Sequence, residues 1–357
     1  SSLVGSEMCI RDRPSSRSPA MEALLWESCD DNKVRCNLCC HRCIIKPEKR
    51  GLCGVRENRA GVLHTRVYGK AIARHIDPIE KKPLFHFLPG SQSYSVATVG
   101  CNFKCRFCQN ADIAQMPSDR NGAVLGDRTT PQKEVAVAAK TGCKSIAYTY
   151  TEPTVFFEFA YDTAKLAHAK GIKNVFVTNG YMTPEALDMI SPWLDAANVD
   201  LKAFTNDFYK KMCGARLPPV LETLKGMKAR GIFLEVTTLL IPGLNDDTDE
   251  LKQLAAFIAN DLGIDTPWHV SRFHPTYRLT DRPATPLESL LNANKIGKKA
   301  GLRYVYTGNV PGPGGEKTIC HQCGRVVIDL WGFSISEYAI DNGNCRQCGT
   351  PVHGVGM

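Results

Sequence analysis

The sequence predicts an α/β protein with a parallel sheet, specifically a partial (β/α)6 TIM-like barrel. A small cysteine-rich segment precedes the barrel and a zinc-ribbon-like module follows it. From about residue 91 the chain repeats the pattern strand, loop, helix, which requires crossover connections and parallel strands. Twelve of the 16 cysteines fall into three clusters at metal-ligand spacing. A stretch rich in glycine and proline, residues 308–315, separates the last cluster from the repeats.

The composition is that of a globular protein. It has 357 residues, of which 43% are hydrophobic and 22% charged. No run approaches the roughly 18 apolar residues of a membrane span, and residues 1–20 lack the apolar core of a secretory signal. Metal-binding thiols need a reducing compartment, so we expect a cytoplasmic protein with no membrane partner. The net charge of +8 has no arginine-rich tract behind it, and we interpret it as a solvated basic surface.

The first 90 residues divide into two parts. Residues 1–20 carry serine, proline and arginine without periodicity, and we interpret them as a disordered or non-native leader. Residues 21–90 are predicted to be a metal-binding segment and an extended lead-in to the barrel. Four of its thiols can close on one metal centre, either a structural zinc or an auxiliary iron–sulfur cluster: Cys36, Cys39, Cys43 and Cys53. Cys40 is left over.

Residues 91–310 are expected to form the barrel. We predict strands at 96–99, 145–150, 174–178, 198–202, 233–241, 268–271 and 303–306, and helices at 131–140, 153–170, 219–230, 247–261 and 287–299. A further helix starts after Thr183. Thr130 and Thr183 each precede a proline, the pattern of an N-cap followed by proline at the first helical position. In such a barrel the loops after the strands gather on one face, where active sites form.

The loop after the first predicted strand carries three thiols in a C-x3-C-x2-C pattern, Cys101, Cys105 and Cys108. Three thiolates from one loop can bind three irons of a [4Fe-4S] cluster and leave the fourth iron open to chemistry. A closed zinc site needs a fourth ligand nearby, and residues 109–111 offer none. The pattern therefore predicts a catalytic cluster here.

Polar residues recur at the C-terminal ends of the later strands. They are Glu152, Asn179, Asp200, Lys202 and His274. Because these ends share one face with the cysteine loop, the pattern predicts one common site.

Residues 311–357 carry two C-x2-C-G motifs with 21 residues between them. They contain Cys320, Cys323, Cys345 and Cys348. This spacing is typical of a four-thiolate zinc ribbon, and we expect Phe333, Ile335 and Tyr338 to form its small core. Ribbons bind nucleic acid or protein in many settings, but fold alone does not assign such a role.

The cysteine loop, with residues 149–153, 175–180 and 200–202, resembles the radical S-adenosylmethionine (radical SAM) superfamily, in particular the branch of the pyruvate formate-lyase activating enzymes. The cysteines of residues 34–56 and the stretch 77–83 are similar to one subgroup, the radical SAM enzyme of the AmmeMemoRadiSam system. The resemblance runs from about residue 21 to 310. Two features depart from it: Cys40 replaces a usual proline, and Tyr150 and Thr151 stand where many members have glycines.

The resemblance implies an enzyme that binds S-adenosylmethionine on the open iron. One electron from the reduced cluster then releases a 5′-deoxyadenosyl radical, which abstracts hydrogen from an unidentified substrate, a small molecule or a protein. An electron donor such as a flavodoxin or ferredoxin is implied as partner. Six residues would bind the cofactor: Phe107 against the adenine, Glu152 at the methionyl amine, Asn179 and Asp200 near the ribose or methionyl part, Lys202 at the carboxylate, and His274 near the nucleoside or substrate.

Two alternatives stay open. One is a glycyl-radical-enzyme activating protein, whose substrate is a backbone glycine that reaches into the barrel. The other is a non-catalytic zinc-binding scaffold or nucleic-acid module. The second leaves the strand-end residues without a role, and the sequence shows no interleaving of aromatic and basic residues, so nucleic acid is not an expected partner.

Overall fold

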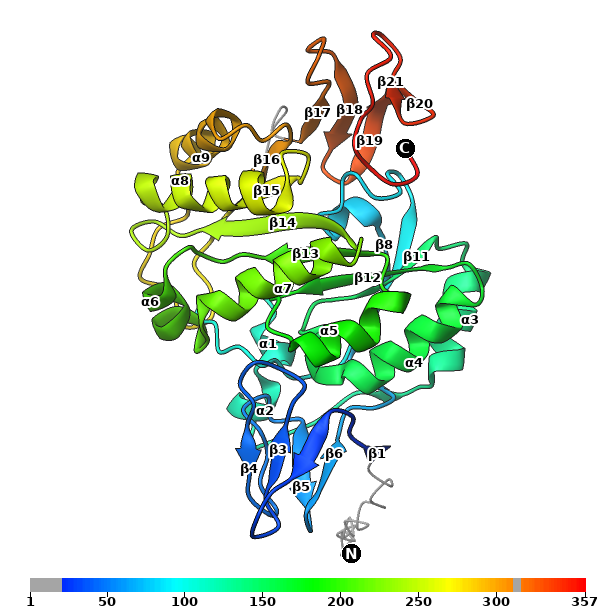
Figure 1. Cartoon of the computed structure of the whole chain (residues 1–357), viewed down its shortest axis with the longest axis vertical. Coiled ribbons are helices and arrows are strands. Elements are labelled where there is room, and N and C mark those ends of the chain that lie inside the picture. Colours follow the sequence, from blue (N-terminus) through cyan, green and yellow to red (C-terminus); the bar gives the residue numbers. More distant parts are fainter. Residues whose placement is uncertain (1–20, 311–315) are drawn as a thin grey trace, which may run out of the picture.

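The computed structural model describes residues 21–310 and 316–357, arranged in three parts along the long axis (Figure 1). A small β module formed by the first residues lies at one end, and a second β module lies at the other. Between them stands a large sheet with helices. The predicted leader, residues 1–20, and the start of the predicted C-terminal module, residues 311–315, lie outside the described residues.

The N-terminal module consists of two small sheets. One pairs β1 (Met21–Glu22), β6 (Val62–Thr65) and β5 (Arg56–Arg59), and the other pairs β2 (Trp26–Ser28), β3 (Val34–Cys36) and β4 (Ile44–Ile45). These strands have two to four residues each, and their turns carry most of the cysteines. Short strands bury little apolar surface, so such a module depends on other bonds for its order.

The central sheet has eight strands in the order β16-β15-β14-β13-β12-β11-β9-β8. Their bounds are β8 (Ala73–Pro78), β9 (Gln92–Ala97), β11 (Ser145–Tyr148), β12 (Lys173–Thr178), β13 (Ala196–Asp200), β14 (Phe233–Leu240), β15 (Trp268–Arg272) and β16 (Val305–Gly308). All neighbours from β9 to β16 pair in parallel, as predicted. β8 adds an antiparallel edge from residues expected to be a lead-in. β8 and β16 do not pair with each other, so within the described chain the sheet is open.

Six helices accompany these strands and pack beside one another on one side of the sheet (Figure 1). They are α3 (Pro131–Lys140), α4 (Phe157–His168), α5 (Pro184–Ile190), α7 (Leu217–Ala229), α8 (Thr248–Phe257) and α9 (Leu287–Lys299). The predicted caps are confirmed: the hydroxyl of Thr130 accepts from Lys133 N at the start of α3, and that of Thr183 accepts from Ala186 N at the start of α5.

Short elements fill the connections. α1 (Ala111–Ala114), α2 (Met116–Asp119) and β10 (Asp127–Arg128) follow the cysteine loop, and β10 pairs with β7 (Lys70–Ala71). η2 (Pro153–Phe156) precedes α4, η3 (Ser191–Trp193) follows α5, and η5 (Ile258–Leu262) prolongs α8. α6 (Asn206–Phe208) and η4 (Tyr209–Cys213) lie between β13 and α7.

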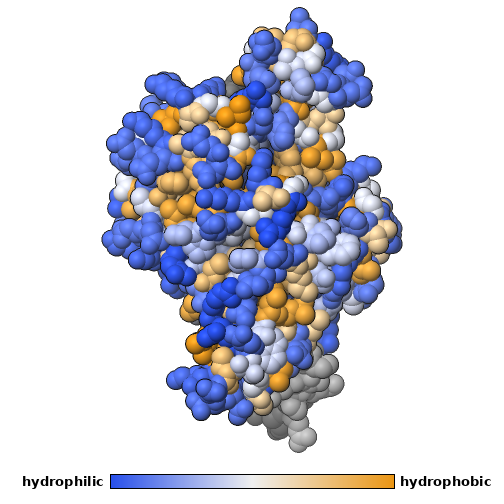
Figure 2. All heavy atoms as spheres, viewed as in Figure 1, coloured by the Kyte–Doolittle hydropathy of each residue, from blue (hydrophilic) through white to orange (hydrophobic). Residues whose placement is uncertain are grey.

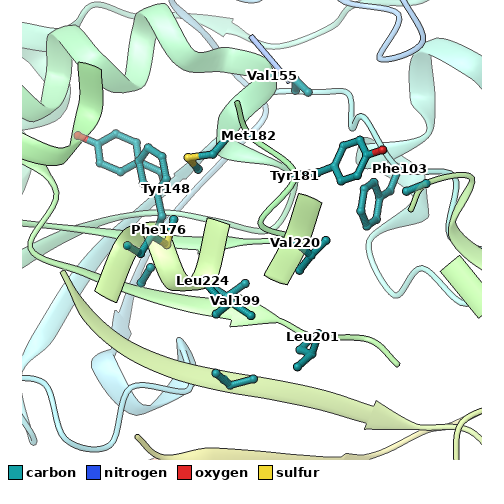
Figure 3. Packing of buried hydrophobic residues seen from close by; sticks show 14 of the residues in the cluster. Phe103, Tyr148, Val155, Phe176, Tyr181, Met182, Val199, Leu201, Val220 and Leu224 are labelled. Atoms are coloured by element: carbon teal, nitrogen blue, oxygen red, sulfur yellow. The ribbon is translucent and has the colours of Figure 1, made fainter. Parts of the chain in front are cut away.

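The core between α7 and the sheet shows why a glycine follows β12. Val220 and Leu224 of α7 lie next to Val199 of β13 (Figure 3). Gly180 has a φ of +66°, and a Cβ there would stand 2.9 Å from Val199 Cγ1. Only glycine fits both the left-handed backbone and the close approach of α7.

The C-terminal module packs on the end of the sheet where the strands begin. It contains β17 (Lys317–Ile319), β18 (Val326–Trp331), β19 (Ser334–Tyr338), β20 (Ile340–Asp341) and β21 (Asn344–Cys345). Val327, Ile328 and Leu330 form its core together with Tyr304 and Tyr306. The predicted core is therefore wrong in one residue: Phe333 lies in the turn after β18 and is 47% exposed, while Ile335 and Tyr338 pack at the edge of the core.

Hydrophilic residues spread over the face shown in Figure 2, from the N-terminal module to the C-terminal one, with hydrophobic residues in small groups between them. Among residues 21–310 and 316–357, no helix is long and apolar enough to cross a bilayer.

Candidate active site

A large cavity opens at the C-terminal ends of the strands. Its volume is about 1440 Å³, which includes space continuous with solvent. Its walls contain eight of the nine residues predicted to be catalytic or to bind a cofactor: Cys101, Cys105, Cys108, Phe107, Glu152, Asn179, Asp200 and Lys202. The single face expected for these residues is thus present as one concave site.

His274 is the predicted residue that the structure does not bring there. Phe273 is fully buried, and the backbone turns after it, so that the side chain of His274 faces solvent. Thr285 fixes this turn, since its hydroxyl accepts a hydrogen bond from Phe273 N at 2.8 Å. A polar residue after a strand is a weak signal, because its direction depends on such contacts.

The cysteine loop is fixed by backbone hydrogen bonds to η4. Lys104 N donates to Cys213 O at 2.7 Å, and Arg106 N donates to Met212 O at 3.0 Å. The ring of Phe103 packs edge-on against Tyr181 with centroids 5.2 Å apart, as Figure 3 shows. Contacts with η4 and with Tyr181 therefore hold the loop in place, as a metal site requires.

Hydrogen-bond donors point at the sulfur of Cys101. Phe103 N lies 3.3 Å and Asn179 Nδ2 3.8 Å from its Sγ. N–H donors of this kind stabilise thiolates. The three loop sulfurs do not all lie within 4.8 Å of one another, since among the described residues only the C-terminal thiols form such a group. Thiolates on three different irons stand farther apart than thiolates on one ion, so the loop fits a cluster.

Glu152 is buried and organises two strand ends. Its Oε1 accepts from Thr154 N at 3.0 Å, Thr154 Oγ1 at 2.6 Å and Thr178 Oγ1 at 2.7 Å, while Oε2 accepts from Asn179 N at 2.8 Å. Burial raises the pKa of Glu152 above its usual value, and these donors oppose that shift. Oε2 has one protein donor, which leaves it capacity to accept from a ligand in the cavity.

Asp200 at the end of β13 and Lys202 just after it form an ion pair in the cavity wall, with Nζ and Oδ2 2.8 Å apart. Burial alone would lower the pKa of Lys202, but attraction to Asp200 and to the thiols of Cys105 and Cys213 together outweighs it and holds the pKa well above its usual value. The ammonium lies 5.9 Å from the centroid of the Phe107 ring. A permanent cation and an aromatic face thus stand side by side.

The structure adds wall residues that the sequence did not single out. Lys82 is buried and its Nζ lies 2.6 Å from Asp77 Oδ2, to which the hydroxyl of Tyr150 also donates. Burial would raise the pKa of Asp77, but hydrogen bonds from Lys81, Lys82 and Tyr150 hold it well below its usual range. Tyr150 has a φ of +63°, a left-handed conformation that is uncommon for a bulky side chain. From its spacing alone the turn 77–83 is expected to be a solvated turn, with side chains that line a site as the alternative. The structure places Lys81 and Lys82 in the cavity wall.

The four C-terminal thiols form a compact group. All four sulfurs lie within 4.8 Å of one another, with Cys320 and Cys348 3.6 Å apart and Cys323 and Cys345 3.8 Å apart. Tetrahedral zinc at about 2.3 Å from each sulfur requires sulfurs about 3.8 Å apart. These cysteines can therefore bind a metal ion as a closed site.

The four N-terminal thiols line a separate, smaller cavity of about 350 Å³, which includes space continuous with solvent. Cys36, Cys39, Cys43 and Cys53 all contribute to its wall. Cys40 does not, because its thiol donates to Met182 O at 3.1 Å. The structure thus separates Cys40 from the other four.

The comparisons with known proteins agree with the fold. Residues 95–258 match the model of the radical SAM superfamily. The chain is 48% identical over 333 residues to the uncharacterized protein MJ0808 of Methanocaldococcus jannaschii, which covers 93% of this chain and 98% of that protein. The chain therefore belongs to the radical SAM superfamily.

A more distant relative has a functional name. The putative glycyl-radical enzyme activating enzyme MJ1632 of the same organism is 24% identical over 213 residues, which cover 58% of this chain and 78% of that protein. Among solved structures, a domain of the pyruvate-formate lyase-activating enzyme from Bacteroides vulgatus aligns with a TM-score of 0.41 at 19% identity, over 46% of this chain and 99% of that one.

Proposed function

We propose that the chain is a radical SAM enzyme that acts on a substrate still to be identified. The observation that carries this is the convergence of the three loop thiols with Glu152, Asn179, Asp200 and Lys202 in one open cavity. Cys101, Cys105 and Cys108 would hold a [4Fe-4S] cluster, which together with S-adenosylmethionine supplies a 5′-deoxyadenosyl radical.

The wall residues provide complementary contacts for a zwitterionic methionyl group. Glu152 Oε2 accepts a hydrogen bond from an ammonium, and Lys202 faces a carboxylate. Asn179 and Asp200 offer polar atoms to a ribose, and Phe107 offers an apolar face to an adenine. Thr178 and Thr154 hold the Glu152 carboxylate in place, so this binding geometry is preorganised.

The other parts of the chain have supporting roles in this proposal. Residues 91–310 form the catalytic domain, residues 21–90 the N-terminal metal-binding part and residues 311–357 a ribbon that holds zinc. The sulfur spacing of the C-terminal thiols supports zinc there. We further propose a cytoplasmic enzyme of the AmmeMemoRadiSam subgroup with a flavodoxin or ferredoxin as electron donor.

The test is cleavage of S-adenosylmethionine. The protein is reconstituted anaerobically with iron and sulfide and reduced, and 5′-deoxyadenosine is measured. We expect cleavage by the wild type and by a Cys29→Ser control, since Cys29 lies in none of the thiol groups, and loss in Cys105→Ala. Cleavage that persists without Cys105 contradicts the proposal.

The glycyl-radical activating enzymes provide a second candidate. The similarity to MJ1632 and the opening of the cavity to solvent support a substrate that enters as a polypeptide. Incubation with a candidate glycyl-radical enzyme would then give a glycine-centred doublet in electron paramagnetic resonance (EPR). If S-adenosylmethionine is cleaved but no doublet forms, the substrate is of another kind.

A further inference from the structure

We infer that the N-terminal module holds a second [4Fe-4S] cluster, bound by Cys36, Cys39, Cys43 and Cys53. This goes beyond the proposed function, which needs only the cluster of the loop Cys101–Cys108. The ligand class follows from two features of the cavity these thiols line: the distance between the sulfurs and the polar groups in the wall.

The sulfur spacing differs from that of a compact zinc site. Zinc with four thiolates needs sulfurs about 3.8 Å apart, which is the spacing of the C-terminal quartet. No three of the N-terminal thiols have sulfurs all within 4.8 Å of one another, because in the part of the chain that the structure describes only the C-terminal group meets this limit. Yet all four line one cavity. A cubane cluster binds each thiolate at a different iron, so it fits thiols that share a cavity but stand apart.

The wall of the cavity offers N–H donors without partners. Arg56 is 2% exposed, and its Nε has no hydrogen-bond partner; Asn102 is 1% exposed, and its Nδ2 has none either. Both residues line the cavity. Buried donors are almost always paired, and the inorganic sulfides of a cluster are acceptors that a single zinc ion lacks. Arg56 also pairs with Glu158, with Nη1 and Oε1 3.0 Å apart, which keeps its charge in the buried wall.

The second cluster would lie next to the first. Asn102 lines the N-terminal cavity and Cys101, its neighbour in the chain, lines the large one. His41 Nε2 lies 2.8 Å from Asn102 O, so the turn after Cys39 contacts the catalytic loop directly. One layer of residues therefore separates the two cavities.

Metal analysis of the full chain tests this inference. Wild type should contain about eight irons, eight sulfides and one zinc after anaerobic reconstitution. The triple variant C101A/C105A/C108A should keep about four irons and four sulfides. Four irons and two zincs in the wild type would overturn the inference, and this measurement does not depend on any variant. Because the triple variant lacks the three loop thiols, its iron count does not depend on the proposed function.

Matched variants identify the ligands. In the triple-variant background, Cys36→Ala with Cys43→Ala should lose the remaining iron, whereas Cys40→Ala should keep it. Equal loss of iron from both would overturn the ligand assignment. The position of the cluster is tested by EPR of the fully reduced wild type. Two variants have one cluster each: the triple variant, and the wild type with Cys36→Ala and Cys43→Ala alone. Magnetic coupling should broaden the wild-type spectrum beyond the sum of their spectra, and a simple sum would contradict adjacency.

Discussion

Glu152 shows how one carboxylate can determine the shape of a cavity. It accepts hydrogen bonds from the start of η2 and from the end of β12, so it joins two strand ends across the sheet. A ligand that donates a hydrogen bond to Oε2 would bind an oxygen whose position is already fixed by Asn179 N.

Glu152→Gln should therefore cost stability as well as binding. One carboxylate oxygen becomes an NH2 group that faces the N–H or O–H donors of Thr154, Thr178 or Asn179. A buried donor left unpaired costs about 1–3 kcal/mol, so we expect the free energy of unfolding in urea to fall by that amount and S-adenosylmethionine to bind at least tenfold more weakly. Thr154→Val, which removes one donor from Oε1 and keeps the carboxylate, should cost about 1 kcal/mol. A Gln variant as stable as wild type would contradict the role of the four donors.

At the level of single residues the sequence identified the thiols and several polar residues of the cavity wall. The strand-end rule placed Glu152, Asn179 and Lys202 on one face, because that rule depends only on strand direction. It did not identify Lys82 and Tyr150, since their burial results from contacts with Asp77, more than 70 positions from Tyr150. It also included His274, whose outward direction is set by Thr285.

At the scale of elements, one of the two threonine caps also contacts the N-terminal module. Thr130 and Thr183 cap α3 and α5 in the same way, but Thr183 Oγ1 also donates to Asn37 O in the N-terminal module at 2.7 Å. The start of α5 is thereby joined to the segment that carries Cys36 and Cys39.

The two caps provide a matched pair of substitutions. Thr130→Ala should lower the free energy of unfolding by about 1 kcal/mol, the usual value of an N-cap. Thr183→Ala should cost about 1 kcal/mol more, since it also leaves Asn37 O without its donor. Urea denaturation of both variants checks this, and equal losses would show that the contact with Asn37 contributes nothing.

Helices and parallel strands were predictable, because caps, glycines and apolar runs are local signals. The antiparallel edge strand β8 was not, since residues 73–78 become a strand only by pairing with β9. The direction of Phe333 was not predictable either: it was expected in the core of the C-terminal module, but it lies in the turn between β18 and β19 and is 47% exposed.

In the whole molecule, a buried polar network joins the sheet to the C-terminal module. His86 Nδ1 lies 2.6 Å from His353 O, and His86 Nε2 lies 2.6 Å from the hydroxyl of Tyr306. Tyr306 contacts Thr318 Oγ1 at 2.7 Å, and Glu235 accepts from His86 N at 2.8 Å. In this arrangement a neutral His86 donates through Nδ1 and accepts through Nε2.

Stability should therefore fall in mild acid. Burial holds the pKa of His86 below its usual value, and burial acts in the same direction on His353. A histidine with a lowered pKa in the folded state contributes stability above its unfolded pKa of about 6.5, and that contribution is lost as the pH falls. We expect the free energy of unfolding to fall between pH 7.5 and 5.5 by up to about 1.4 kcal/mol per pH unit for each such group.

The control is His86→Gln, which should be less stable than wild type at pH 7.5 and show a flatter pH dependence. Zinc content measured at each pH separates this effect from loss of metal. An unchanged slope in the variant would assign the acid sensitivity to other groups.

The contact between His86 and His353 spans 267 positions of the chain, and Phe87 pairs with Val355 in the same region. At a translation rate of about 5–20 residues per second, roughly 10–50 s pass between synthesis of the two partners. During this time the C-terminal module is not yet present to bury Phe87 and its neighbours. The cysteines of the N-terminal cavity and of the loop Cys101–Cys108 leave the ribosome well before the C-terminal module exists. Any metal centre that they bind could therefore be filled while the base of the sheet is still incomplete.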